Sequence, residues 1–288
     1  MLPRADVSLG RIEEVLNHKL AIDNFKQSTK YNYDEVKDDE YIKFEKVTFD
    51  YDEGKNKIFK GLDFKIKKNS INAIVGPTGS GKSSVLKLLL RFYDVKSGKV
   101  SINGVDVKDY KEKDLRSIIS YVPQKVNLFQ GSLSENVRTN PNIPINKRRV
   151  EEALRFANMG DFIDSHKDGI NHVISQGAAN LSGGQKQRVT IARAIYEDQP
   201  ILLLDDPFSA LDANTEKKIN SSLIKDFKDK TILVVTQRLS SVVNYDNIIF
   251  INKGKVVATG THKQLMKNCK EYKEAFEKAK ASTIEDVK

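Results

Sequence analysis

One stretch limits the folds open to this chain more than any other. The apolar run SINAIVG leads into the glycine-rich segment GPTGSGKSS, residues 76–84, and then into KSSVLKLLLRFY. A continuous apolar run ending in glycine is typical of a strand buried on both faces, and the apolar spacing that follows is typical of a helix. The glycines let backbone N–H groups point inward at phosphate oxygens, and the helix N-terminus adds its dipole. The sequence therefore predicts a strand, a phosphate-binding loop and a helix in succession.

The glycine-rich segment fits the pattern G-x-x-x-x-G-K-[ST] through Gly76, Gly81, Lys82 and Ser83. Lys82 is expected to reach the β- and γ-phosphates and to act in catalysis, and the Ser83 hydroxyl is expected to bind Mg²⁺. An accidental glycine-rich turn is the alternative, but it would not require a buried strand before it and a helix after it. Nucleotide contacts are predicted for the whole segment, which comprises Gly76, Pro77, Thr78, Gly79, Ser80, Gly81, Lys82, Ser83 and Ser84.

Buried apolar strands alternate with helices along most of the chain, which favours an α/β core with a mainly parallel sheet. A strand-like alternation from Tyr41 starts an antiparallel β piece at the front of this core, and residues 135–181 read as a mostly helical subdomain. We expect three parts. Residues 1–40 hold a short amphipathic helix over residues 7–20 and a polar linker over residues 21–40, residues 41–268 form the compact domain, and residues 269–288 form a helical tail.

Composition excludes some chemistries and leaves others open. The formal net charge of +9 suits a polyanion, but the lysines are scattered, and a solvated lysine-rich surface is the commoner cause. The single cysteine, Cys269, excludes an internal disulfide, and four dispersed histidines show no metal-ligand spacing. No apolar run reaches the length of about 18 residues that a membrane span needs, and the N-terminus lacks a signal-peptide core. The chain itself is therefore expected to be soluble and intracellular.

ILLLDDPFSALD, residues 201–212, places two adjacent carboxylates at the end of a second buried apolar run. Proteins with a phosphate-binding loop use an acidic residue at the end of such a parallel strand to hold Mg²⁺. Asp205 is therefore predicted to be a Mg²⁺ ligand, and a strand-end aspartate that caps the next turn is the alternative. The adjacent Asp206 is not explained by this loop alone.

The segment LSGGQKQRVTIARAI, residues 181–195, lies shortly before this stretch and resembles the signature motif of ABC-transporter nucleotide-binding domains. The resemblance covers roughly residues 41–268 and implies a P-loop NTPase fold with an antiparallel β subdomain and a helical subdomain, binding ATP and Mg²⁺. The Ser182 hydroxyl and the amides after it form a second anion cradle at a helix start, although a helix cap would also explain this serine. In the family the signature motif, here Ser182, Gly183, Gly184 and Gln185, closes over the ATP of the opposite subunit.

Further positions match the family in order. Tyr51 matches the aromatic residue that stacks on adenine, and a plain strand aromatic is the alternative reading. Gln124 matches the glutamine that reaches Mg²⁺ and the attacking water and couples the site to the membrane domain. Asp212 matches an aspartate at the dimer interface. SLGRIEEVL near the N-terminus resembles the segment after the last transmembrane helix of exporters, which implies a transmembrane domain of the same half-transporter as a partner.

The chain departs from the family in three places. Asp206 stands where a glutamate usually polarises the attacking water, so its carboxylate is one methylene shorter and general-base geometry tolerates little displacement. Gln237 stands where a histidine usually contacts the γ-phosphate, and a glutamine cannot carry the charge of an imidazolium. Gln176 replaces a glutamate just before the signature motif. Any one change could be drift, but together they resemble the degenerate-site subunit of heterodimeric exporters.

The resemblance implies an ATPase domain at the cytoplasmic face of the plasma (inner) membrane, paired with a second ABC half-transporter. Its own site is expected to hydrolyse ATP slowly, with Asp206 and Gln237 in the catalytic positions, while its signature motif completes the partner's active site. A fully active homodimeric exporter ATPase is one alternative. A soluble ABC-type ATP switch acting on nucleic acid is another, but only the basic charge supports it. No direct nucleic-acid partner is expected, because the chain lacks an aromatic and basic surface signal.

Overall fold

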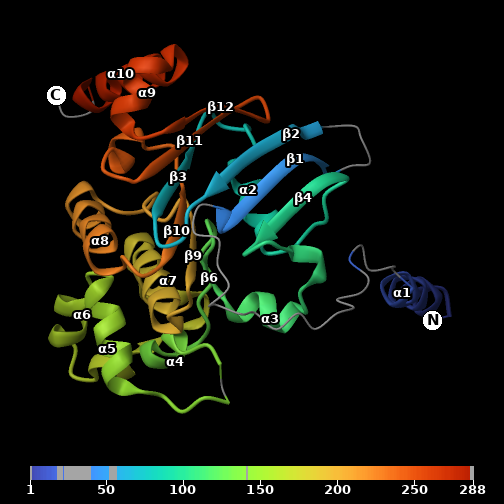
Figure 1. Ribbon diagram of the computed structural model, residues 1–288. Helices are drawn as coiled ribbons and strands as arrows, with labels where there is room; N and C mark the ends of the chain where they lie inside the picture. Colours follow the sequence, from blue (N-terminus) through green and yellow to red (C-terminus); the bar gives the residue numbers. More distant parts are fainter. Residues whose placement is uncertain (1, 18–21, 23–39, 52–56, 141, 286–288) are drawn as a thin grey trace.

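A six-stranded, mainly parallel sheet forms the centre of the protein (Figure 1). The computed structural model describes residues 2–17, 22, 40–51, 57–140 and 142–285. The strands of the central sheet are, in spatial order, β12 (Lys255–Gly260), β11 (Asn247–Asn252), β3 (Ile71–Val75), β10 (Thr231–Val235), β9 (Ile201–Asp205) and β6 (Ile119–Val122). All neighbouring pairs are parallel except the edge pair of β11 and β12. The predicted α/β fold with a mainly parallel sheet is confirmed.

The predicted antiparallel β piece is a second sheet of four strands, with β2 (Lys57–Ile66), β1 (Ile42–Asp50), β4 (Ser97–Ile102) and β5 (Val105–Asp106) in that order. Asn103 and Gly104 join β4 to β5 with φ angles of 52° and 78°, the left-handed pair that a two-residue hairpin requires. Helix α2 (Lys82–Leu89) contributes Val85 and Leu86 to one apolar core with residues of both sheets (Figure 1). Its N-terminal end is thereby fixed at the edge of the central sheet.

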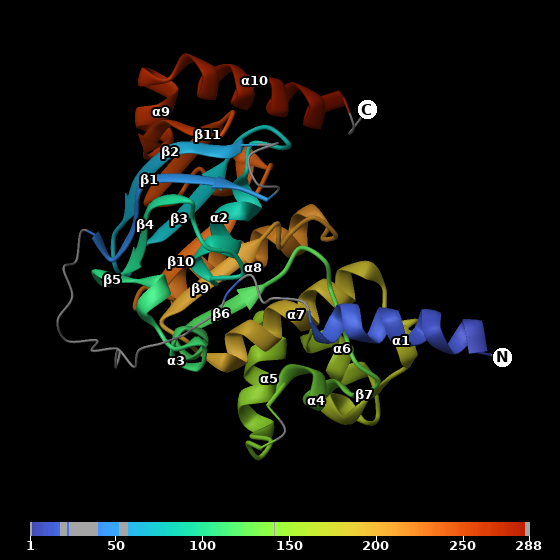
Figure 2. The ribbon, with the colours of Figure 1, turned by 90° about the vertical axis from the view of Figure 1, so that its right-hand side faces the viewer.

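Helices cover the opposite face of the central sheet, where Leu202, Leu204 and Val234 belong to a second apolar core (Figure 2). Because β3, β9 and β10 are buried at every position, their sequences are mostly apolar and do not alternate, with Asn72, Asp205 and Thr231 as the polar exceptions. The remaining helices are α1 (Leu2–Leu16), α3 (Glu112–Ser117), α4 (Leu133–Val137), α5 (Lys147–Phe156), α6 (Gly160–Ser165), α7 (Gly183–Glu197), α8 (Ala213–Asp226), α9 (His262–Asn268) and α10 (Lys270–Glu285). No helix within the described parts of the chain is long and apolar enough to cross a bilayer.

The region predicted as a helical subdomain holds α5, α6 and most of α4, and it also contains a short strand that the sequence did not predict. β8 (Val173–Ile174) pairs antiparallel with β7 (Gly131–Ser132). Strands of two residues are too short to show an alternating pattern. At the N-terminus, α1 occupies most of the predicted helical stretch, and the predicted linker lies outside the described residues except Ile22 and Glu40.

The turn between β11 and β12 presses against the start of β2. Gly254 in this turn has a φ of +72°, and a Cβ atom built on it would lie 1.9 Å from the carbonyl oxygen of Ile58. Backbone atoms cannot move aside as a flexible side chain could. The lack of a side chain at Gly254 therefore permits the hairpin to pack directly against the second sheet.

We expect Gly254→Ala to reduce the free energy of unfolding more than Gly61→Ala does. Gly61 has a similar φ of +79° but no atom within 4 Å of the added Cβ, so both variants carry the left-handed strain of about 1–2 kcal/mol. Only Gly254→Ala adds a collision, for which overpacking data suggest a further ~1–3 kcal/mol. Urea unfolding of the two variants measures the difference, and equal losses would contradict the close packing of the hairpin.

Candidate nucleotide-binding site

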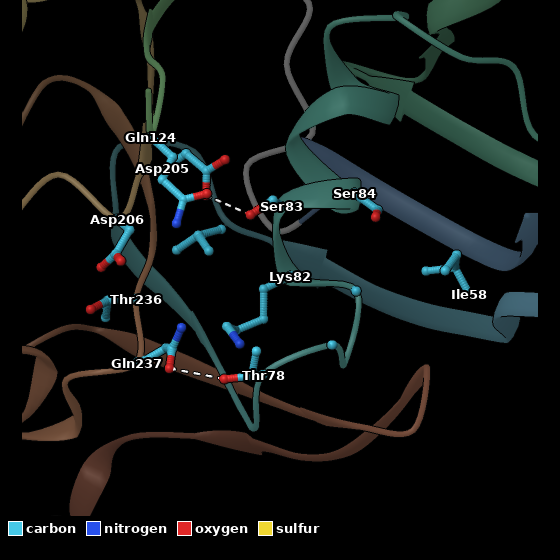
Figure 3. A pocket seen from close by; sticks show the side chains of 13 residues that line it. Ile58, Thr78, Lys82, Ser83, Ser84, Gln124, Asp205, Asp206, Thr236 and Gln237 are labelled. Carbon is cyan, nitrogen blue, oxygen red and sulfur yellow. Dashed lines mark hydrogen bonds between the residues drawn. The ribbon is translucent and has the colours of Figure 1, made fainter. Parts of the chain in front are cut away.

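A pocket of about 270 Å³ opens at the carboxyl edge of the central sheet, beside the N-terminus of α2 (Figure 3). Open α/β sheets bind ligands at this edge because the loops after several parallel strands meet there. The pocket brings together ten of the residues predicted from sequence: Thr78, Gly79, Gly81, Lys82, Ser83, Ser84, Gln124, Asp205, Asp206 and Gln237.

The glycine-rich loop connects β3 to α2 and forms one side of the pocket. Gly81 precedes the helix with a φ of +97°, and an added Cβ there would lie 2.6 Å from the Phe59 ring. The Lys82 ammonium donates hydrogen bonds of 2.8 Å to the carbonyl oxygens of Gly76 and Pro77. Burial lowers the pKa of Lys82, although the Asp206 and Asp205 carboxylates oppose this shift. A buried cation inside a curled backbone suits a polyanion such as a triphosphate.

The predicted Mg²⁺ ligands lie together where the start of α2 faces the end of β9 (Figure 3). Ser83 Oγ donates a 2.7 Å hydrogen bond to Asp205 Oδ1, and Gln124 lines the same pocket (Figure 3). Burial raises the pKa of the Asp205 carboxyl, which the Ser83 hydroxyl partly offsets. A hydroxyl, a carboxylate and an amide oxygen form a hard donor set that suits Mg²⁺. Within the described residues, no cluster of three or more His, Cys, Asp or Glu offers a metal site elsewhere.

Asp206 and Gln237 lie on the side of the pocket formed by the loops after β9 and β10. Asp206 has a φ of +47°, and its N–H donates a 2.8 Å hydrogen bond to the Val235 carbonyl. Burial raises the pKa of the Asp206 carboxyl, and the nearby Arg238 and Lys82 oppose the rise. The Gln237 side chain is exposed, and its Oε1 accepts a 3.2 Å hydrogen bond from the Thr78 hydroxyl (Figure 3). A carboxylate and an amide thus face the glycine-rich loop.

Several predicted residues lie outside the lining of this pocket. The Tyr51 hydroxyl is 2.8 Å from Ser84 Oγ, and its ring meets Tyr93 edge-on while the Lys87 ammonium lies 5.3 Å from the ring centre. The pocket lining also omits Gly76, Pro77 and Ser80, which belong to the loop itself, and Ser182, Gly183, Gly184, Gln185 and Asp212.

The signature motif forms the N-terminus of α7. Ser182 Oγ accepts from the N–H of Gln185, and Gln185 Oε1 accepts from the N–H of Ser182, which is a capping box. Asp212 caps α8 in a similar way by accepting from Asn214 and Thr215. Gln176 is exposed in a single helical turn before the motif.

Sequence reasoning missed Ile58, Val235 and Thr236 in the pocket lining, and Tyr121 beside it. Burial and the Asp205 carboxylate raise the pKa of Tyr121 to about 12. Val235 is the last residue of β10, and Thr236 follows it directly before Gln237, so their position follows from that strand once the pocket is known. No sequence signal marks Ile58, because it belongs to the other sheet.

The fold and this pocket define a P-loop nucleotide-binding domain. The ABC transporter family matches residues 59–209, which is more than half of the chain. The chain belongs to the ABC transporter family, and it is homologous to the ATP-binding domains of ABC exporters.

Individual relatives support this assignment. An uncharacterized ABC transporter ATP-binding protein of Mycobacterium tuberculosis is 38% identical over 276 residues, covering 95% of this chain and 47% of that protein. The ATP-dependent lipid A-core flippase of Aliivibrio fischeri is 37% identical, covering 88% of this chain and 43% of the flippase. The structure of a bacterial Atm1-family ABC exporter with ATP bound superposes with a TM-score of 0.86 at 29% identity, covering 96% of this chain and 47% of that one. The chain thus spans less than half the length of each relative.

Two aspartates of the segment after β9 should respond to pH with opposite signs. The raised pKa of Asp206 means that its ionisation opposes folding, so its contribution to stability is present at acid pH and lost as pH rises through its folded pKa. Hydrogen bonds from the backbone lower the pKa of Asp212, so its contribution is present at neutral pH and lost on acidification.

We therefore expect Asp206→Asn to raise the melting temperature of the nucleotide-free, Mg²⁺-free chain at pH 7, with the gain vanishing near pH 4 and below, where the unfolded aspartate is protonated. Asp212→Asn should lower the melting temperature at pH 7, with the loss fading as pH falls. Thermal unfolding of both variants between pH 4 and 8 measures the two slopes. Slopes of the same sign would contradict these environments.

Proposed function

We propose that this chain is the ATP-binding domain of one half of a heterodimeric ABC exporter, and that its own site hydrolyses ATP slowly. It would work at the cytoplasmic face of the plasma (inner) membrane with the transmembrane domain of the same half-transporter. A second ABC half-transporter would supply the opposite nucleotide-binding domain. Direct binding to nucleic acid is not part of this function.

The observation that carries the proposal is the pairing of a weakened pocket with an intact signature motif. Asp206 and Gln237 lie opposite the glycine-rich loop, in the positions where the family usually has glutamate and histidine. The shorter Asp206 carboxylate reaches less far toward an attacking water, and proton transfer loses rate steeply with displacement. Because Gln237 Oε1 accepts from Thr78, only its neutral amide NH₂ remains to donate toward a phosphate. Neither residue replaces the cationic charge of an imidazolium.

The signature motif supports a role in the partner's site. Its Ser182 and Gly183 are exposed, and they begin a 15-residue helix whose first amides and dipole favour an anion. None of its residues lines the pocket of this chain. A cradle of this kind, separate from the chain's own phosphate site, suits the nucleotide of another subunit.

The remaining residues of the pocket suit the binding of MgATP. Lys82 and the loop amides would hold the phosphates, and Tyr51 would stack on adenine from outside the present lining. Ser83, Asp205 and Gln124 would hold Mg²⁺, which neutralises phosphate charge when bound. Asp206 would contribute little as a base, because its shorter side chain falls short of the attacking water. Binding would therefore be retained while hydrolysis is impaired.

We expect Asp206→Glu combined with Gln237→His to raise the ATPase rate of the purified chain about a hundredfold or more, since one such polar group is typically worth 10²–10³ in rate. The affinity for ATP should change little, because Lys82 and the loop are untouched. Phosphate release at saturating MgATP measures the rate, and binding of a fluorescent ATP analogue measures the affinity.

Two control variants make this test specific. Lys82→Ala in the doubly substituted chain should remove the gained activity, and Asp206→Asn alone should leave the slow basal rate nearly unchanged. If the unmodified chain already matched the doubly substituted one, and Asp206→Asn abolished its activity, the homodimeric ATPase would be the correct function instead.

A further inference from the structure

Arg238, the residue after Gln237, joins segments that lie far apart in the sequence. Its Nη1 forms an ion pair with Glu216 Oε2 on α8, and the Ser241 hydroxyl donates to the other carboxylate oxygen of Glu216. Its Nη2 makes a long contact of 3.5 Å with the Ser209 carbonyl oxygen, in the segment that follows Asp206. Its backbone N–H donates a 3.0 Å hydrogen bond to Thr236 Oγ1. One side chain thus connects the loop after β10 with the segment after β9 and with α8.

The burial of Glu216 makes this connection stiff. Glu216 is only 8% exposed, and both of its carboxylate oxygens are used by Arg238 and Ser241. Removing one partner of such a pair leaves an uncompensated buried charge. The loop that carries Gln237 and the first turn of α8 are therefore held in one relative position.

The connected segment, residues 207–211, also touches the signature motif of the same chain. A Cβ atom built on Gly184 would lie 3.0 Å from the Ala210 carbonyl oxygen and 3.7 Å from Leu211 Cδ2. Ala210 directly follows Ser209, which Arg238 contacts. The start of α7 is thus packed against the segment that Arg238 holds.

A second set of hydrogen bonds connects α7 with α8. Arg188, one turn further along α7, donates a 2.6 Å hydrogen bond to the Asn158 carbonyl oxygen and a weaker one of 3.4 Å to the Gly184 carbonyl oxygen. The Asn158 side chain in turn lies 3.4 Å from the Thr215 hydroxyl on α8. The first turn of α7 is therefore linked to the first turn of α8 a second time, through Arg188 and Asn158.

At the other end of this path, Gln237 meets the nucleotide pocket. Its amide oxygen accepts from Thr78 in the glycine-rich loop, so phosphates entering the loop lie beside this contact. We propose that Arg238 is a positioning residue that transmits ATP occupancy of this chain's own pocket, through residues 207–211, to its own signature motif. The inference rests on the proposed function. ATP bound at the slowly hydrolysing site would then order the signature motif that completes the partner's site.

Hydrogen exchange of the full chain, read by mass spectrometry with and without saturating MgATP, tests this proposal. The concentration is kept where sedimentation shows single chains, so that docking between copies cannot protect the motif. ATP should slow exchange in residues 76–84 and also slow exchange in residues 183–186 about fivefold or more, the lower end of ordinary coupling between sites. In Arg238→Met, ATP should still slow exchange in residues 76–84 and leave residues 183–186 unchanged.

Control variants separate positioning from stability. Arg155→Met removes an exposed arginine that pairs with Asp164 at 2.7 and 2.9 Å, and it should respond to ATP as the unmodified chain does. Glu216→Gln keeps the shape of the buried side chain but removes its charge. It should also abolish the ATP-dependent protection of residues 183–186, so the test still stands if Arg238→Met folds poorly.

Three outcomes would overturn the inference, and they differ in what else they affect. If MgATP protected residues 183–186 in Arg238→Met and in Glu216→Gln as strongly as in the unmodified chain, the motif would be ordered without this arginine. Protection of residues 76–84 alone in the unmodified chain would refute the coupling and leave ATP binding intact. No protection of residues 76–84 would refute the proposed function as well.

Discussion

The burial of the central sheet on both faces is the constraint on which the rest of the structure depends. Strands β3, β9 and β10 are buried at every position, so their residues are mostly apolar, and the one charged residue among them, Asp205, stands at the end of β9. All three are parallel neighbours and end at one edge. That edge therefore collects the glycine-rich loop, Asp205 with Asp206, and Gln237 around one pocket. Lys82 and Asp205 are buried there, which strengthens their interactions with a bound phosphate and metal ion.

Within this pocket, the residues proposed to bind ATP and Mg²⁺ are those typical of the family, whereas the residues proposed to act in hydrolysis are not. Lys82 is held by two carbonyl oxygens of the loop and Ser83 donates to Asp205, an arrangement that suits a phosphate and metal site. The proposed function assigns Asp206 and Gln237, which line the same pocket, to the catalytic positions, where they supply a shorter carboxylate and a neutral amide. We therefore propose that this chain binds ATP and hydrolyses it slowly, while its signature motif completes the nucleotide site of the partner. Arg238 and Glu216 would connect these two tasks through the segment that packs on Gly184.

Much of this could be predicted from the sequence, because the strongest signals are local. The run before Gly76 predicted β3, and the spacing after it predicted α2. Contacts between distant segments could not be predicted in this way. Ile58 enters the pocket from the second sheet, and the Arg238 ion pair depends on how α8 packs beside β10. β8 was missed because two residues carry no period.

The central claim is that this chain's own pocket binds ATP and hydrolyses it slowly. Single-turnover chemistry tests it most directly: the chain in excess is mixed with a trace of ATP labelled at the γ-phosphate plus Mg²⁺, and the bound nucleotide is separated and identified over time. The account predicts that the bound label remains as ATP long after the chain carrying both Asp206→Glu and Gln237→His has converted it to phosphate. Conversion by the unmodified chain at the same rate would contradict the account.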